Sequence, residues 1–315
     1  MKIAVNTSSL TYGDKLNFAQ FEELGDVKFF GDIPREELFS LCSDVDALIV
    51  NNVKVDEALI AACPNLKYVG TFATGYNVVD IEACRRRKIT VCNAPNYSTH
   101  SVSQHAFSLL LELYSRTGEY VQSVNRGDWI NSKTFCYFPF ETHELYGKTF
   151  GVYGYGNIGS AVAKIAEAFG ANVIVCTRKP PKDCPYKLVD FDEILRESDI
   201  LSLHCPLNEE TAKLINAAAL KKMKKSAVLI NTARGGLIDE EALADALNSG
   251  EIAGAALDTV AVEPMRADNP LYGAKNCLIT PHVGWTPHET RERLIEIVAG
   301  NLKAFIGGTP QNVVS

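Results

Sequence analysis

The chain has 315 residues, more than one typical domain core contains, so two domains are expected. Hydrophobic residues make up 46% and charged residues 22%, which is ordinary for a globular protein in water. A net charge of −7 without long Lys/Arg blocks argues against a nucleic-acid partner, and no apolar run is long enough to span a membrane. Nine scattered cysteines without a C-x-x-C pair predict no metal site and a reducing, cytoplasmic location.

The first 93 residues alternate short apolar runs with helical patterns. The runs read as strands at 3–5, 27–30, 47–50, 68–71 and 89–92, and the patterns between them read as helices at 18–24, 35–41, 56–62 and 80–87. Such alternation predicts a parallel sheet that helices cover on both faces.

The turn after the fourth predicted strand contains Ala73, Thr74 and Gly75. Ligands of parallel sheets bind beyond the carboxyl ends of the strands, so this turn is a candidate ligand loop. An ordinary glycine-containing turn explains the same residues equally well.

Residues 101–116 form a long apolar helical pattern with polar Gln104 and His105 in its first turns. This helix is expected to link the first domain to the second. Residues 126–146 are irregular and rich in aromatic side chains. They predict either an exposed arm that meets a partner or a loop folded back on its own domain.

The second half opens with a strand at 150–153, the glycines Gly154, Gly156 and Gly159 in the spacing G-x-G-x-x-G, a helical pattern over 161–169 and a further strand at 173–176. Three glycines alone are a weak signal. Between a strand and a helix they predict a dinucleotide-binding turn, with the phosphates at the helix N-terminus. The alternative is a glycine-tightened turn in a domain without a ligand.

The acid that holds the ribose hydroxyls, expected about 20 residues after the glycines, is missing. Thr177, Arg178 and Lys179 stand there instead. An arginine at this point accommodates a 2′-phosphate, but a solvated basic turn before two prolines gives the same residues. The choice between NAD and NADP therefore stays open.

Further strands are predicted at 200–204, 227–231, 253–257 and 277–280, with helices at 192–197, 211–225 and 239–248. A last helix, 289–305, follows the second domain and is expected to return to the first.

Three polar residues follow the ends of these strands: Arg234, Glu263 and His282. Each alone has a structural explanation, but together they converge on one sheet edge. An arginine binds a carboxylate through two parallel hydrogen bonds, and a histidine donates a proton to a carbonyl oxygen. A glutamate beside the histidine favours its protonated form and fixes its tautomer. These are the groups needed to reduce a 2-keto acid with a nicotinamide cofactor.

Several longer segments resemble one known family, the D-isomer-specific 2-hydroxyacid dehydrogenases. They are INTARGGLIDEEALADAL, GYGNIG, the Asp258…Glu263-Pro264 spacing and the Pro281-His282-x-Gly284 segment. The likeness runs through nearly the whole chain. The segments ATGYNVVD, VCNAPNYSTHSVSQH and GWTPHETRERL look closest to the glycerate dehydrogenase (hydroxypyruvate reductase) branch.

The resemblance implies an α/β fold of two Rossmann-like domains, one flavodoxin-like and one dinucleotide-binding, with the active site in a cleft between them. The substrate domain would comprise residues 1–98 and 288–315, and the NAD(P)-binding domain residues 99–287. Family members are commonly homodimers, joined through the nucleotide domain and an arm like 126–146.

The resemblance also implies a role for individual residues. Arg234 would clamp the substrate, His282 would be the general acid/base, and Glu263 its partner. The implied substrate contacts are Ala73, Thr74, Gly75, Arg234 and Trp285. The implied cofactor contacts are Gly154, Tyr155, Gly156, Asn157, Ile158, Gly159, Thr177, Arg178, Cys205, Pro206, Thr211, Thr232, Asp258, His282 and Gly284.

The resemblance implies reduction of a small 2-keto acid, hydroxypyruvate or glyoxylate. An indole at Trp285 would agree with this choice, because it would exclude long substrate side chains. A core position for Trp285 is the alternative. Two other functions stay open: a dehydrogenase for a bulkier acid such as phenylpyruvate or 2-ketoisocaproate, and a nucleotide-sensing scaffold similar to the C-terminal-binding corepressors.

Overall fold

The computed structural model describes residues 1–8, 10, 11 and 15–315. The chain divides into two units, which we call the terminal unit (Met1–Ser98 with Trp285–Ser315) and the central unit (Thr99–Gly284). The chain returns from the central unit to the terminal unit between Gly284 and Trp285, whereas the expected boundary was after residue 287. The difference arises because Trp285 packs against the apolar core of the terminal unit.

The terminal unit contains a five-stranded sheet in which all strand pairs are parallel. Its order is β2-β1-β3-β4-β5, the order of flavodoxin-like folds. The strands are β1 (Lys2–Asn6), β2 (Asp26–Phe30), β3 (Ala47–Val50), β4 (Tyr68–Thr71) and β5 (Thr90–Cys92).

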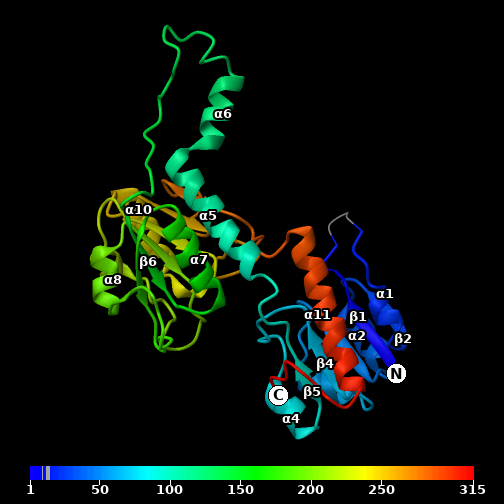
Figure 1. Ribbon diagram of the computed structural model, residues 1–315. Helices are drawn as coiled ribbons and strands as arrows, with labels where there is room; N and C mark the ends of the chain where they lie inside the picture. Colours follow the sequence, from blue (N-terminus) through cyan, green and yellow to red (C-terminus); the bar gives the residue numbers. More distant parts are fainter. Residues whose placement is uncertain (9, 12–14) are drawn as a thin grey trace. The chain divides into compact units, whose positions relative to one another are not determined.

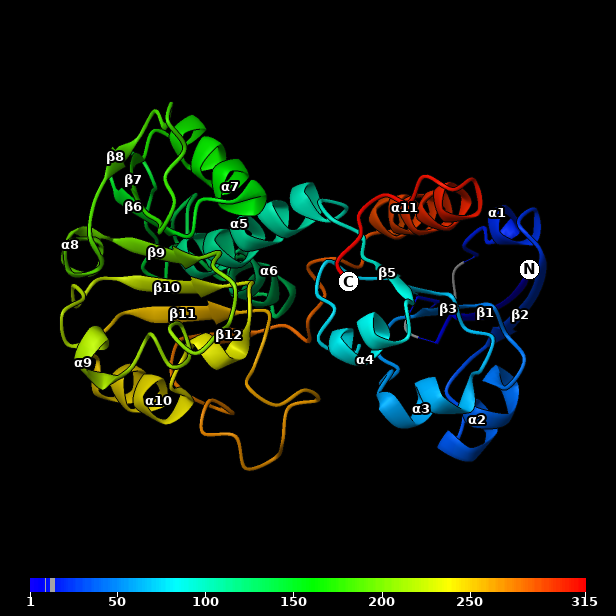
Figure 2. The same ribbon diagram turned by 90° about the horizontal axis from the view of Figure 1, so that it is seen from below.

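Helices cover both faces of this sheet (Figure 2). Three of them, α2 (Arg35–Cys42), α3 (Glu57–Ala62) and α4 (Ile81–Arg86), enclose one apolar core, and α1 (Ala19–Glu22) and α11 (His288–Ile306) enclose the other. The last helix packs through Leu294, Ile295, Val298 and Leu302, which share one face at helical spacing. The C-terminal segment is therefore part of the terminal unit.

The central unit contains a seven-stranded parallel sheet in the order β12-β11-β10-β9-β6-β7-β8. The strands are β6 (Thr149–Tyr153), β7 (Asn172–Cys176), β8 (Lys187–Leu188), β9 (Ile200–Leu203), β10 (Val228–Asn231), β11 (Gly254–Leu257) and β12 (Cys277–Ile279). Strand order reverses between β6 and β9, the point where Rossmann folds bind ligands beyond the carboxyl ends of their strands. The predicted fold class is confirmed.

Two layers of helices cover this second sheet (Figures 1 and 2). One layer is formed by α5 (Thr99–Ser115) and α7 (Asn157–Ala168), and the other by α8 (Phe191–Glu197), α9 (Ala217–Leu220) and α10 (Glu240–Ser249). None of the helices in the described part of the chain combines the length and apolar character that crossing a membrane requires.

The helix predicted over 211–225 is wrong for most of its length, because only Ala217–Leu220 is helical. Lys213 has φ of +49°, and Ile215 pairs with Ile238 as an isolated bridge. The side chain of Asn216 then accepts hydrogen bonds from the backbone of Ala218 and Ala219 and starts the short helix there. The apolar side chains of this segment fill the core mainly from a loop, and their spacing in the sequence happens to match that of a helix.

Residues 126–146 and the preceding α6 (Thr117–Asn125) form an arm that projects from the body of the central unit (Figure 1). Large hydrophobic side chains of the arm are more than half exposed: Val121, Trp129, Ile130, Phe135, Phe138 and Tyr146. The structure thus shows an exposed arm, while the end of the segment returns to its own unit, where Leu145 is buried in the core.

Candidate active site

The glycine turn joins β6 to α7 by a very close approach of backbone to backbone. Gly154 has φ of +93°, and a Cβ there would lie 2.6 Å from the backbone nitrogen of Cys205. A Cβ on Gly159 would lie 2.0 Å from the carbonyl oxygen of Gly154. Both positions therefore require glycine, as the dinucleotide-binding turn does.

Gly156 differs from these two glycines, because a Cβ added there would meet no heavy atom within 4 Å. The motif keeps a glycine at this point so that a pyrophosphate can approach the backbone. Tyr155, Asn157 and Ile158 complete the turn, and Asn157 begins α7. A helix N-terminus favours bound phosphate through its N–H groups and its dipole.

A buried hydroxyl group of the same unit is also available to a ligand. Thr232 follows β10, is 8% exposed, and its Oγ1 has no hydrogen-bond partner in the described part of the chain. Buried polar atoms are normally paired, so an orphaned hydroxyl fits a site that a polar ligand completes. Together with the open space at Gly156, it fits a dinucleotide cofactor.

The loop after β9 carries Cys205, Pro206 and Thr211. Burial raises the pKa of the Cys205 thiol to about 11, so this side chain is neutral and apolar at physiological pH. The Thr211 hydroxyl donates to the carbonyl oxygen of Pro206 at 2.7 Å and accepts from the Asn208 N–H at 2.9 Å. Thr211 thus braces the loop; its contact with a cofactor stays a prediction.

Arg234 lies in the loop after β10, and neighbouring residues hold this loop in place. The Asn231 side chain donates to the carbonyl oxygen of Arg234 at 2.9 Å and accepts from the Ala233 N–H at 3.0 Å. A Cβ on Gly235 would lie 1.9 Å from the carbonyl carbon of Val260. The loop of Arg234 therefore packs directly against the segment that leads to Glu263, while the Arg234 side chain stays exposed.

His282 and Glu263 form a hydrogen-bonded pair, with 2.8 Å between Nδ1 and Oε2. The other carboxylate oxygen accepts the N–H of Val260 at 3.1 Å. Burial raises the pKa of the Glu263 carboxyl group. This effect is outweighed by the hydrogen bonds from His282 and the Val260 N–H and by the charges of His282 and Arg234, which lower the pKa. The net pKa lies below its ordinary value. Glu263 is therefore an anion that holds one ring nitrogen of His282.

The turn that carries His282 is held by Asp258, which is 2% exposed. Its carboxylate accepts hydrogen bonds from Thr280 Oγ1 (2.6 Å), the N–H groups of Val283 and Gly284 (both 2.8 Å) and His105 Nε2 (3.1 Å). Burial raises the pKa of the Asp258 carboxyl group, but these hydrogen bonds lower it by more than burial raises it. The net pKa therefore lies below its ordinary value. The buried Asp258 anion fixes the chain on either side of His282.

The structure brings Arg234, Glu263 and His282 to the carboxyl ends of β10, β11 and β12, three adjacent strands of one sheet. Thr177 and Arg178 follow β7 at the same edge. Ala73, Thr74 and Gly75 belong to the terminal unit, where the Thr74 hydroxyl donates to the Ala94 carbonyl oxygen at 2.9 Å. Trp285 is partly buried against the core of that unit. The substrate contacts assigned to these four residues stay predictions.

Comparison with known proteins now places this site in a family. The model for the NAD-binding domain of D-isomer specific 2-hydroxyacid dehydrogenases matches residues 107–284. The hydroxypyruvate reductase of Blautia hydrogenotrophica is 44% identical over 89% of this chain and 88% of its own length. The chain belongs to the D-isomer specific 2-hydroxyacid dehydrogenases. The predicted family is thus confirmed, and with it an oxidoreductase that uses NAD or NADP.

Two further relatives cover the family more widely. The glycerate dehydrogenase of Methylorubrum extorquens is 42% identical over 89% of this chain and 88% of its own length. An acyclic imino acid reductase, solved with NADPH and D-Arg, shares the fold with a TM-score of 0.89 and 33% identity, and both chains are covered completely. The similarity of this dehydrogenase to these two proteins therefore extends through both of its units.

Sequence reasoning missed the role of His105 in this dehydrogenase. Its Nε2 lies 3.1 Å from Asp258 Oδ1 and 2.9 Å from Thr280 Oγ1, so α5 is tied to the turn of His282. The available signal was a polar residue within a largely apolar helix. Without the fold, that signal does not identify the partner.

Proposed function

We propose that this dehydrogenase reduces hydroxypyruvate or glyoxylate with NADH or NADPH and forms the corresponding 2-hydroxy acid. The observation that carries the proposal is the His282–Glu263 pair beside Arg234 at the edge of a nucleotide-binding sheet. The relatives named as hydroxypyruvate reductase and glycerate dehydrogenase support the choice of substrate.

The nicotinamide cofactor supplies the hydride that reduces the substrate carbonyl. The glycine turn would hold its pyrophosphate, and Thr232 would face it with an otherwise unpaired hydroxyl. Arg234 would bind the substrate carboxylate through two parallel hydrogen bonds. With Nδ1 of His282 donating to Glu263, Nε2 is the nitrogen that gives its proton to the carbonyl oxygen and takes it back in the reverse reaction.

The charge of Glu263 should set the pH range of the reaction, because it stabilises the protonated imidazole that reduction requires. In Glu263→Gln the charge that is bonded to Nδ1 of the proposed proton donor is absent. We expect the upper pH limit of reduction to move down by about one unit, and oxidation to begin at correspondingly lower pH. Profiles of kcat/KM against pH in both directions measure the shift.

A charge change elsewhere on the unit provides the control for that profile. Glu241 is exposed on α10, and Glu241→Gln removes the same charge without touching His282. Its profile should match that of the unmodified protein. An unchanged profile in Glu263→Gln would remove Glu263 from the mechanism.

The substrate assignment is tested by following nicotinamide absorbance with NADH and NADPH against a panel of 2-keto acids. We expect higher kcat/KM on hydroxypyruvate and glyoxylate than on phenylpyruvate or 2-ketoisocaproate, with Trp285 proposed to limit side-chain size. A preference for the bulky acids would overturn this substrate choice. Turnover only in the presence of an amine would fit instead the imino acid chemistry named for the similar reductase.

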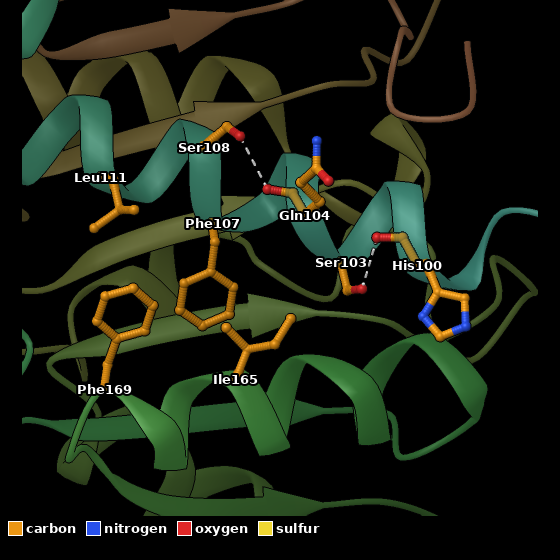
Figure 3. Close-up of a pocket in the computed structure, with 8 residues that line it drawn as sticks. All are labelled: His100, Ser103, Gln104, Phe107, Ser108, Leu111, Ile165 and Phe169. Carbon is orange, nitrogen blue, oxygen red and sulfur yellow. Dashed lines mark hydrogen bonds between the residues drawn. The ribbon is translucent and has the colours of Figure 1, made fainter. Parts of the chain in front are cut away.

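A homodimer in the cytoplasm is part of the proposal. The dimer is supported by the exposed apolar arm and by a groove between α5 and α7 that is lined by both apolar and polar side chains (Figure 3). In that groove the ring of Phe107 stacks on Phe169, which is 43% exposed. The cytoplasmic location is supported by the nine cysteines, all of them unbridged thiols. Sedimentation as a monomer would contradict the dimer.

A further inference from the structure

Arg178, at the position where a Rossmann fold recognises the cofactor ribose, is not free of partners. It follows β7, and its Nη1 lies 3.3 Å from Oε2 of Glu210 in the loop after β9. Both side chains are largely exposed, at 72% and 75%. The only acidic group paired with this arginine therefore comes, within the described residues, from a different strand end.

The loop that carries Glu210 is well braced. Oδ1 of Asn208 accepts the N–H groups of Glu210 and Thr211, both at 3.0 Å. The Thr211 hydroxyl in turn donates to the Pro206 carbonyl oxygen at 2.7 Å. These bonds fix the backbone of residues 206–211, so Glu210 is presented to Arg178 by the fold of the loop and not by a chance side-chain rotamer alone.

We propose that Glu210 is a specificity-determining residue that weakens binding of the 2′-phosphate of NADP by competing for Arg178. A 2′-phosphate carries nearly two negative charges at neutral pH and needs the guanidinium that Glu210 already contacts. The 2′-phosphate can replace Glu210 as the partner of Arg178, because this ion pair is exposed and weak. The Glu210 carboxylate then remains nearby and repels the phosphate. The ribose of NAD carries only hydroxyl groups there, so Glu210 does not oppose it.

The proposal rests on the NAD(P) use of the proposed function, and it is tested without turnover. Calorimetry in about 0.15 M salt, where long-range effects are screened, compares 2′,5′-ADP with 5′-AMP as probes of the adenosine end. Glu210→Gln should tighten 2′,5′-ADP by about three- to tenfold, the range that one exposed charge contact produces, and leave 5′-AMP unchanged.

Glu209→Gln is the matched control, because it removes the same charge from the neighbouring exposed residue. It should leave the affinity for 2′,5′-ADP close to that of the unmodified protein. In an Arg178→Gln background, Glu210→Gln should tighten 2′,5′-ADP less, because no guanidinium remains to be released and only the repulsion between Glu210 and the 2′-phosphate is relieved.

Three results would overturn the role of Glu210. They are no tightening in Glu210→Gln, equal tightening in Glu209→Gln, and the same tightening with and without Arg178. If neither the unmodified protein nor any variant bound 5′-AMP, this result would instead overturn the adenosine site itself and thus the proposed function. All three substitutions, at Arg178, Glu209 and Glu210, lie on exposed side chains, so none of these outcomes is expected to arise from unfolding.

Discussion

Replacing His282 by alanine is expected to lower the turnover of 2-keto acid reduction by about 10²–10⁴-fold, the usual contribution of a general acid. The reason is that Nε2 of His282 is the proposed proton donor, while Nδ1 is held by Glu263 at 2.8 Å. Cofactor binding should persist, because the glycine turn and Thr232 are untouched. Steady-state kinetics and a separate titration of NADH binding measure the two effects.

His100→Ala is a suitable control, since His100 is an exposed histidine of the same unit. It should keep its turnover within about twofold, because exposed substitutions are usually almost neutral. If His282→Ala retained full turnover with an unchanged pH profile, another group would have to supply the proton.

Replacing Arg234 by glutamine is expected to raise the KM for the 2-keto acid by about 10- to 100-fold, the equivalent of a lost hydrogen bond between charged groups. The Arg234 side chain is exposed, and its Nη1 donates to the Ala233 carbonyl oxygen at 2.7 Å. The remaining guanidinium N–H groups would bind the substrate carboxylate. Affinity for NADH should change little.

Two further variants separate charge from geometry at this position. Arg234→Lys keeps the charge but not the planar fork, so it should recover only part of the affinity. Arg266→Gln removes an exposed arginine that is paired with Asp268 in the same unit, and it should leave KM unchanged. A KM in Arg234→Gln equal to that of the unmodified protein would remove Arg234 from substrate binding.

The order and type of most elements follow from local sequence alone. Buried parallel strands read as short apolar runs, and a helix that packs on a sheet repeats its apolar residues at a period near 3.6. The turn from Gly154 to Gly159 was equally readable, because its three glycines have a fixed spacing within six residues, between a strand and a helix. Polar residues just after β10, β11 and β12 marked one sheet edge before any contact was known.

Tertiary structure decided the rest, because contacts between distant residues leave no local period. The 211–225 segment looks helical, yet Ile215 pairs with Ile238 and the helix shrinks to four residues. His105 and Asp258 are 153 positions apart, and only the packing of α5 beside the sheet brings them together. Arg178 likewise meets Glu210 across 32 positions. The sequence by itself determined the family and the fold, and it placed Arg234, Glu263 and His282 at one sheet edge. The pairing of charges around these residues and at the ribose position depended on the folded loops, because the free energy of such a pair depends on the distance between its charges.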